Sequence, residues 1–368
     1  LSTPTAGTNN VRFGANAGNS ITSGARNVFV GDEAGKSLTS GFNNVAIGES
    51  ALENDTQGQQ SIAIGRNALL AQNFTSATDA YNVAIGASAG AAVTTGVNNT
   101  LIGGLAGDAM TTGSSNTGVG KSALGGATEG SQNSALGHGA LLSVTTSSNN
   151  TAMGYLAGNL MTTGEQNTLI GSLAGDAITT GNNNVAVGYQ SLSADTLGER
   201  NAALGAFALA NQNFTSSTQS YNTAVGYGAL ISNTTGTENT SIGGLSGDAL
   251  SVGSNNTVVG SQALSTDTKG SQAVAIGRAA LFAQNFTSAT NSQNTAVGYH
   301  AGVSVTIGQE NTLIGHSAGD ALTDADLNVA VGASALSSDT LGSASVAIGK
   351  SALAFKTLLP LQIRSTPQ

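Results

Sequence analysis

Two short segments of the chain carry the spacing of a serine hydrolase nucleophile. Gly315–Gly319 reads GHSAG and Gly86–Gly90 reads GASAG, each directly after an apolar run, as in the G-x-S-x-G turn of a hydrolase. Ser317 would be the nucleophile, and a triad would also need a histidine. The same positions read GGLAG from Gly103 and GSLAG from Gly171. Because the glycines persist where the serine is absent, we expect a repeat and no enzyme.

Two other patterns imitate ligand sites. Val30–Ser37 reads VGDEAGKS, with three residues between the glycines where a phosphate-binding loop has four, and its acidic pair would repel phosphate. A Gly-Asp pair also recurs about every four repeats. Calcium needs several oxygens at one point, so we expect these aspartates to cap turns, and we predict neither a metal nor a cofactor. They are Asp108, Asp176, Asp248 and Asp320.

The chain is built from one short repeat. Glycine ends the phrase N-V-A-I-G, or a close variant, twenty times between Gly14 and Gly349. The spacing is 17 residues, apart from gaps of 21 after Gly65, Gly205 and Gly277. A fixed period of this kind is typical of solenoids, and we call one repeat a coil.

Each coil predicts one short strand followed by turns. Alternation of Val and Ile indicates a strand of about five residues, and the frequent glycines disfavour helix. A single coil buries too little apolar surface to fold alone, so the coils must stack with their strands paired. The predicted fold class is all-β, a parallel β-solenoid or β-roll of about 20 coils with a 17-residue period.

The alternation gives each strand two faces. We expect Val45 and Ile47 to fill the solenoid and Ala46, between them, to point outward. The column of Ala46 is small or apolar, where a solvent-facing strand would carry polar residues. An apolar stripe of this length favours an oligomer over a monomer that leaves the stripe in water. The predicted oligomer face comprises Ala46, Ala84, Leu101, Leu169 and Leu313.

Two further columns have predicted structural roles. The glycine that ends each strand turns the chain, for example at Gly48, Gly103, Gly171 and Gly243. An asparagine stands four residues before most of these glycines, as at Asn44, Asn99, Asn167 and Asn239. It can tolerate a left-handed turn at the strand entry, form a ladder of hydrogen-bonded amides, or do both.

The long gaps carry nearly identical inserts. They read AQNFTSAT from Ala71, NQNFTSST from Asn211 and AQNFTSAT from Ala283. Loops that leave a rigid solenoid are frequent binding sites. Each insert holds one phenylalanine, which either packs back over the adjacent coil or contributes to a shallow contact site for a sugar or another surface. These residues are Phe74, Phe214 and Phe286.

Composition disfavours several classes of partner. The chain has 368 residues, a net charge of −9, no cysteine and only 8% charged residues, with no basic patch. We therefore expect no nucleic-acid partner and no thiolate metal site. No apolar run is long enough for a transmembrane helix, so membrane insertion is not expected. A single threonine column lacks the paired lattice expected for ice binding.

The phrase N-[VT]-A-[IV]-G resembles the head repeats of trimeric autotransporter adhesins, and TTGxxNTLIGxxAG is similar to repeat arrays of tail-fibre-domain proteins. The resemblance covers residues from Asn10 to about Leu353. It implies a homotrimeric, extracellular fibre, with a host-surface glycan or protein as receptor. The alternatives are a bacterial surface adhesin head and a subunit of a self-assembling filament.

We therefore predict three segments. Residues 1–9 are a lead-in, residues 10–354 form a β-solenoid rod of five four-coil blocks, and residues 355–368 are a cap or docking tail. The predicted function is a non-enzymatic shaft or receptor-facing rod of a phage-type tail fibre or a similar appendage, on a virion or a bacterial surface.

Overall fold

The computed structural model describes residues 7–355, which form two compact units. The first comprises the residues up to Glu199 with Thr215–Thr218, and the second comprises Arg200–Phe214 with the residues from Gln219 onward. Both are all-β parallel solenoids, with about 20 coils in total, as the sequence predicts. Residues 1–6 and 356–368, which include almost all of the predicted tail, lie outside the described residues.

The first unit contains eleven three-residue strands, one per coil. They pair in chain order, each parallel to the next. They are β1 (Val11–Phe13), β2 (Val28–Val30), β3 (Val45–Ile47), β5 (Ile62–Ile64), β7 (Val83–Ile85), β8 (Thr100–Ile102), β9 (Thr117–Val119), β10 (Ser134–Leu136), β11 (Thr151–Met153), β12 (Thr168–Ile170) and β13 (Val185–Val187).

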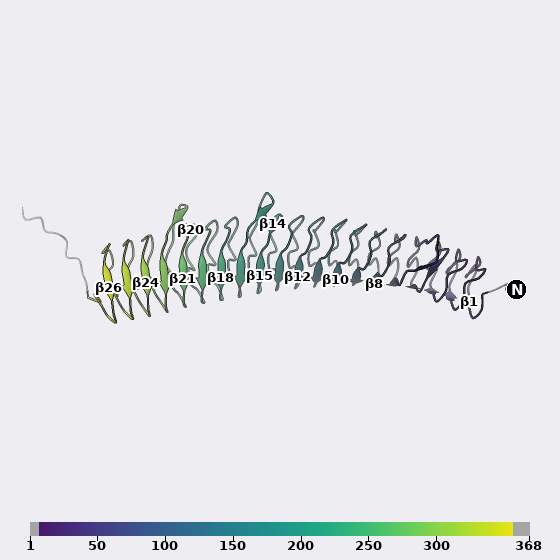
Figure 1. The fold of residues 1–368 in the computed structure, drawn as a ribbon, viewed down its shortest axis with the longest axis horizontal. Coiled ribbons are helices and arrows are strands. Elements are labelled where there is room, and N and C mark those ends of the chain that lie inside the picture. Colours follow the sequence, from purple (N-terminus) through teal and green to yellow (C-terminus); the bar gives the residue numbers. More distant parts are fainter. Residues whose placement is uncertain (1–6, 356–368) are drawn as a thin grey trace, which may run out of the picture. The chain divides into compact units, whose positions relative to one another are not determined.

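The second unit contains nine such strands, also paired in chain order. They are β15 (Ala202–Leu204), β17 (Thr223–Val225), β18 (Thr240–Ile242), β19 (Thr257–Val259), β21 (Val274–Ile276), β23 (Thr295–Val297), β24 (Thr312–Ile314), β25 (Val329–Val331) and β26 (Val346–Ile348). Within each unit the strands lie side by side (Figure 1).

Six two-residue strands accompany the inserts. They are β4 (Gly58–Gln59), β6 (Thr78–Asp79), β14 (Gly198–Glu199), β16 (Thr218–Gln219), β20 (Gly270–Ser271) and β22 (Thr290–Asn291). β4 pairs with β6, and β20 with β22. The described residues contain no helix that could cross a membrane.

The strands are shorter than the predicted five residues because left-handed backbone bounds them on both sides. In the coil of β8, Asn98 lies at φ 60° two residues before the strand, and Gly103 lies at φ 136° directly after it. Both values fall outside the extended conformation of a strand. The register nevertheless stays fixed. Val83 opposes Thr100 one period later, and Ile62 opposes Val83 across an insert.

The core is a set of stacked columns inside the coils. In the coil of β8 it consists of Leu101 at the middle of the strand, Ala106 three residues after the glycine and Met110 seven residues after it. All three side chains are fully buried. Side chains of this kind fill the interior of each coil and contact their counterparts in the next, which gives a core continuous along the stack.

The middle position of the strand and the position four residues after the strand-ending glycine share one volume. Where the middle position holds leucine, the other position holds glycine. A Cβ atom built at Gly107 would lie 2.8 Å from Cδ2 of Leu101, and one built at Gly90 would lie 2.9 Å from its Cδ1. Where Ala46 occupies the middle of the strand, the position that corresponds to Gly107 holds Leu52, which is buried at φ 53°. The interior volume is therefore kept constant, and Leu169 and Leu313 show the same arrangement. Leu169 lies against Gly158 and Gly175, and Leu313 against Gly302 and Gly319.

This exchange predicts a compensating pair of substitutions. Leu101→Ala should reduce the free energy of unfolding by about 2–5 kcal/mol, because it leaves a cavity. Gly107→Leu alone should overpack the coil at a cost of roughly 1–3 kcal/mol. The double variant reproduces the coil of Ala46 and Leu52, so it should recover most of the loss in a urea-unfolding double-mutant cycle. Additive losses would show that the two positions do not share one volume.

Candidate functional site

The hydrolase-like segments lie in regular turns between coils. Ser317 adopts φ 52° and Ser88 φ 56°. The backbone N–H of Ser317 donates to the carbonyl oxygen of Tyr299 at 2.9 Å, and that of Ser88 donates to Arg66 in the same way at 2.8 Å. The ring of His316 stacks on Tyr299, with centroids 5.3 Å apart. Within residues 7–355 no three His, Cys, Asp or Glu side chains gather into a metal-binding group.

The strand-ending glycines turn the chain, as predicted. Gly103 lies at φ 136°, which favours glycine, and a Cβ atom there would lie 2.5 Å from the carbonyl oxygen of Gly120 in the next coil. Both the backbone angle and the close approach of the next coil therefore require glycine. Gly48, Gly171 and Gly243 lie at φ 131°, 136° and 139°.

The asparagine column forms the predicted ladder, mainly through the backbone. The Asn167 Oδ1 accepts the N–H of Asn184 at 2.9 Å, and its Nδ2 donates to the carbonyl oxygen of Gly181 at 2.9 Å. Asn44, Asn99 and Asn239 make equivalent bonds. The other interpretation, in which these asparagines themselves adopt the left-handed conformation at the strand entry, is wrong. That conformation belongs to the residue before each of them: Asn43, Asn98, Gln166 and Glu238.

The predicted oligomer face is wrong, because the structure places it inside the coils. Every member of that set is fully buried within one chain: Ala46, Ala84, Leu101, Leu169 and Leu313. In every three-residue strand except β1, whose middle residue Arg12 is exposed, the middle residue is buried in the narrow interior, where the opposite wall of the coil covers it. The first and third strand residues, predicted to be internal, therefore point outward.

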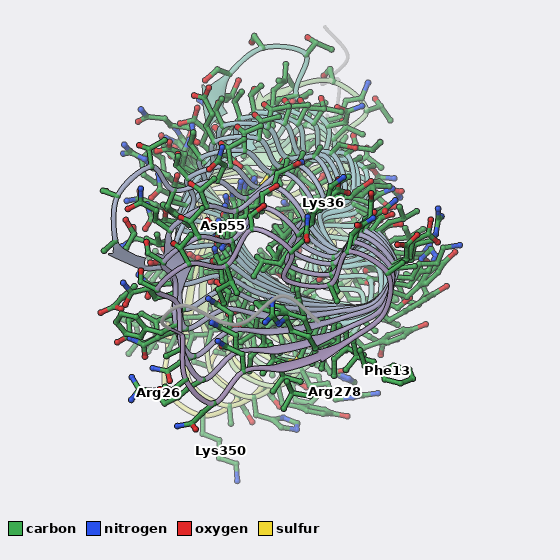
Figure 2. The ribbon with its side chains drawn as sticks, turned by 90° about the vertical axis from the view of Figure 1, so that its right-hand side faces the viewer. Phe13, Arg26, Lys36, Asp55, Arg278 and Lys350 are labelled. Atoms are coloured by element: carbon green, nitrogen blue, oxygen red, sulfur yellow. The ribbon has the colours of Figure 1, made fainter. Side chains whose placement is uncertain are left out.

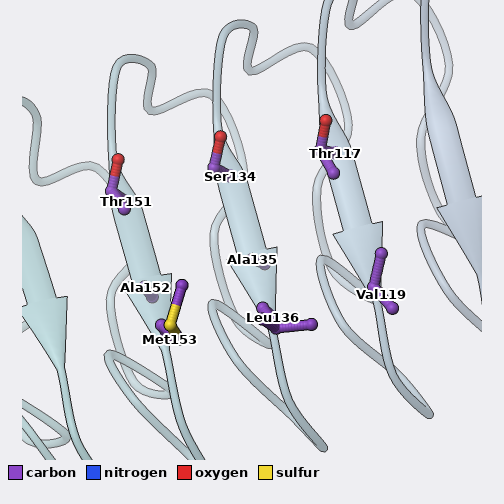
Figure 3. A pocket seen from close by; sticks show the side chains of 8 residues that line it. All are labelled: Thr117, Val119, Ser134, Ala135, Leu136, Thr151, Ala152 and Met153. Carbon is purple, nitrogen blue, oxygen red and sulfur yellow. The ribbon is translucent and has the colours of Figure 1, made fainter.

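The outward positions form a surface that we call the outer strand face. It consists of the first and third residues of the twenty three-residue strands, and none of these forty residues is charged. Leu136 and Met153 are each 45% exposed, whereas Ala135, in the middle of β10, is 1% exposed. A shallow hollow of about 270 Å³ lies over β9, β10 and β11, where the side chains of Leu136 and Met153 project in front of the ribbon (Figure 3). The sequence signal for this face is its lack of charge.

The insert phenylalanines cannot form an exposed contact site. Phe74, Phe214 and Phe286 are only 6%, 4% and 4% exposed. Of the two interpretations, packing back over the coil is correct. The exposed residues of the first insert are Asn73 and Thr75 to Ala77, and those of the last insert are Asn285 and Thr287 to Ala289.

A buried polar network that the sequence did not reveal holds the first insert. Asp55 Oδ1 accepts the N–H of Gly58 at 3.0 Å and that of Phe74 at 3.2 Å. Asp55 Oδ2 accepts Gln72 Nε2 at 2.6 Å, and Gln72 Oε1 accepts Asn82 Nδ2 at 2.9 Å. Figure 2 labels Asp55 inside the outline of the coils. Burial raises the pKa of Asp55, and the hydrogen bond from Gln72 opposes this effect.

The same network explains two exceptions in the asparagine column. The ladder position holds Ser61 before the first insert and Ala273 before the last. There an insert glutamine supplies the missing amide: Gln72 donates to Ser61 Oγ at 3.0 Å, and Gln284 Oε1 accepts Asn294 Nδ2 at 2.8 Å. The repeated Asp-Thr-x-Gly and Gln-Asn-Phe-Thr phrases were the available signal.

The Gly-Asp column has a smaller role than predicted. Turn capping belongs to a different column, in which Asp Oδ1 accepts the N–H three residues later at Asp55, Asp195, Asp267 and Asp339. Burial raises the pKa of Asp108, Asp176 and Asp320. The Oδ1 atoms of Asp176 and Asp320 are buried without a hydrogen-bond partner among residues 7–355. The Oδ1 of Asp248, by contrast, accepts the Ser265 hydroxyl.

No family model, curated protein or solved structure matches the chain. The chain is a parallel β-solenoid repeat protein, and its surfaces are the remaining guide to its function.

The ladder predicts unequal roles for neighbouring asparagines. Asn167→Ala should lower the free energy of unfolding by about 2–4 kcal/mol, because a buried N–H and a buried carbonyl lose their partners. As a control, Asn183→Gly changes an exposed asparagine at φ 59°, and its effect should be within about 0.5 kcal/mol. Chemical denaturation measures both. Equal losses would mean that the ladder adds nothing beyond general packing.

The buried carboxyl group of Asp176 predicts that removal of its charge will stabilise the fold in a pH-dependent way. Its folded pKa is raised by burial, so its ionisation costs stability at neutral pH, and this cost disappears as pH falls through the folded pKa. Asp176→Asn should raise stability at pH 7 by about 0.5 kcal/mol or less, given solvent screening, and the gain should shrink on acidification. Asp248→Asn, which alters a carboxylate that already has a partner, should give no gain. Thermal melts across pH test both, and a gain that persists in acid would contradict the assignment.

Proposed function

We propose that the chain is a structural subunit of an extracellular fibre that assembles with copies of itself through the outer strand face. The observation that carries this proposal is the absence of charge from forty outward positions. Thirty of them are apolar, and the other ten are Ser or Thr. A strand face that remains in water normally carries charged and polar residues, while the apolar residues lie on the opposite, buried face.

The size of this face supports a stable assembly. A three-residue strand covers about 10 Å by 4.8 Å, roughly 50 Å². Eleven strands then give about 530 Å² and nine give about 430 Å², so a trimer that covered all of it would bury on the order of 2,900 Å². Obligate oligomers bury about 2,000–5,000 Å², whereas the largest apolar patch of a typical monomer is about 300–600 Å².

The resemblance to adhesin-head and tail-fibre repeats supports the number three and the extracellular setting. In this proposal the protein is a shaft or receptor-facing segment of a phage-type tail fibre or similar appendage. The oligomer face is the column that includes Val45 and Ile47, not the column of Ala46. The stacked coils give stiffness, and the exposed insert loops and coil turns are the surfaces left for a receptor.

The proposal predicts that charge on the outer strand face abolishes assembly. The unmodified chain should be trimeric at micromolar concentration in mass photometry. Leu136→Glu with Met153→Lys places opposite charges on two paired positions of β10 and β11. Burying them should weaken association at least about 100-fold, close to 3 kcal/mol, and yield monomers with unchanged circular dichroism.

Leu160→Lys is the matched control, because Leu160 is 51% exposed and belongs to no strand. It should leave the trimer intact. A monomeric unmodified chain would overturn the proposal, and equal dissociation in both variants would refute the assignment of the face.

A further inference from the structure

Four side chains from three coils form a cluster on the surface of the second unit. Arg278, Tyr299 and His316 each directly follow a strand-ending glycine in successive coils, and His300 adjoins Tyr299. The ring of Tyr299 stacks on His300 and on His316, with centroids 3.9 and 5.3 Å apart and interplanar angles of 20° and 15°. Arg278 lies over the Tyr299 ring, 5.7 Å from its centroid. The ring faces therefore pack on one another, and the polar edges remain accessible.

The guanidinium of Arg278 is held by one of its nitrogens. Nη1 donates to the Tyr299 hydroxyl at 3.3 Å and to Nε2 of His300 at 3.2 Å. An arginine has five N–H donors, so the described contacts leave Nε and Nη2 free. These two nitrogens form the planar fork that binds a carboxylate through two parallel hydrogen bonds. Because the aromatic cluster already orients the fork, less side-chain entropy is lost on binding. Figure 2 labels Arg278 at the margin of the coils.

A hollow of about 260 Å³ adjoins Arg278. Its lining includes Arg278 and His300, together with Gln262, Phe282 and Val303. Gln262 offers an amide that can donate to and accept from hydroxyl groups. Phe282 and Val303 are half-buried and offer apolar surface. Its volume is near the lower limit for small-ligand sites, which suits one sugar ring.

From this arrangement we propose that the second unit binds an acidic sugar. The ligand carboxylate pairs with Nε and Nη2 of Arg278, and the sugar ring lies in the hollow against Phe282, with Gln262 at its hydroxyl groups. Neither the outer strand face nor the insert phenylalanines take part, so the site is independent of the proposed fibre assembly.

The surrounding charge favours one acidic unit over a long polyanion. The net charge of the chain is −9, which repels densely charged polymers at a distance. Asp320 lies close enough to His300 and His316 for them to act electrostatically on its carboxyl. It therefore opposes a second anionic group beside the first.

The test is calorimetric titration of the full chain with D-glucuronate, with D-glucose and acetate as comparators. Glucuronate should bind with a dissociation constant of about 1 mM, a free energy of roughly −4 kcal/mol. Glucose should not bind, because it lacks the carboxylate. Acetate should bind at least about 10-fold more weakly than glucuronate, because it lacks the sugar ring. Arg278→Ala and Arg278→Lys should each weaken glucuronate binding about 10-fold or more, because lysine keeps the charge and loses the fork.

The matched control is Arg200→Ala. Arg200 also donates to a tyrosine hydroxyl, that of Tyr221, and lies 5.4 Å from the centroid of its ring, but no histidine ring is described in contact with it. This variant should bind glucuronate normally, and so should the Leu136→Glu, Met153→Lys variant, whatever its oligomeric state. No saturable binding up to about 10 mM glucuronate, or equal loss in Arg200→Ala and Arg278→Ala, would overturn the proposal.

Discussion

A buried asparagine amide ties most coils to the next, and most of the architecture depends on this contact. The Oδ1 of Asn99 accepts the N–H of Asn116 at 3.0 Å, and its Nδ2 donates to the carbonyl of Gly113 at 2.9 Å. These partners lie 17 and 14 residues further along the chain. The amide therefore fixes the length of the coil and the position of the glycine in its second half. A buried donor or acceptor without its partner is costly, so the period is held by polar satisfaction as well as by packing.

The repeat in the sequence was sufficient to predict the fold class, the coil number and the glycine turns, because all of these follow from the period. The ladder was one of two roles that the sequence left open for the asparagine column. The direction of the side chains did not follow from the period. Alternation in a three-residue strand separates Ala46 from Val45 and Ile47, but it does not say which face is interior. The interior of a 17-residue coil is narrow and receives Ala51 and Leu52 from the opposite wall, so only a small residue fits at Ala46.

The inserts show where sequence reasoning fails for a different reason. Phe74 has polar neighbours in the sequence, which made it a candidate for surface contact. Its burial depends on Asp55 and Gln72, which lie 19 and two residues away and meet only in the folded coil. Asp55 accepts the N–H of Phe74 and the amide of Gln72, and this closes the loop base over the ring. No local pattern encodes that convergence, although each component repeats in the sequence.

Repetition within one chain also separates what stacking requires from what it leaves free. The strand-ending glycine and the buried ladder amide are held in nearly every coil by contacts with the next coil. The position directly after the glycine varies from coil to coil, for example Arg66, Lys121, Tyr155, Arg278 and His316. Its side chain lies outside the coil, so a charged or aromatic group there does not disturb the stack.

The outer strand face has the opposite character, because it is exposed within one chain and yet excludes charge in every coil. In the proposed assembly, contact with a second copy accounts for that exclusion. The uniform face therefore fits self-assembly, and the variable column beside it fits recognition of a ligand.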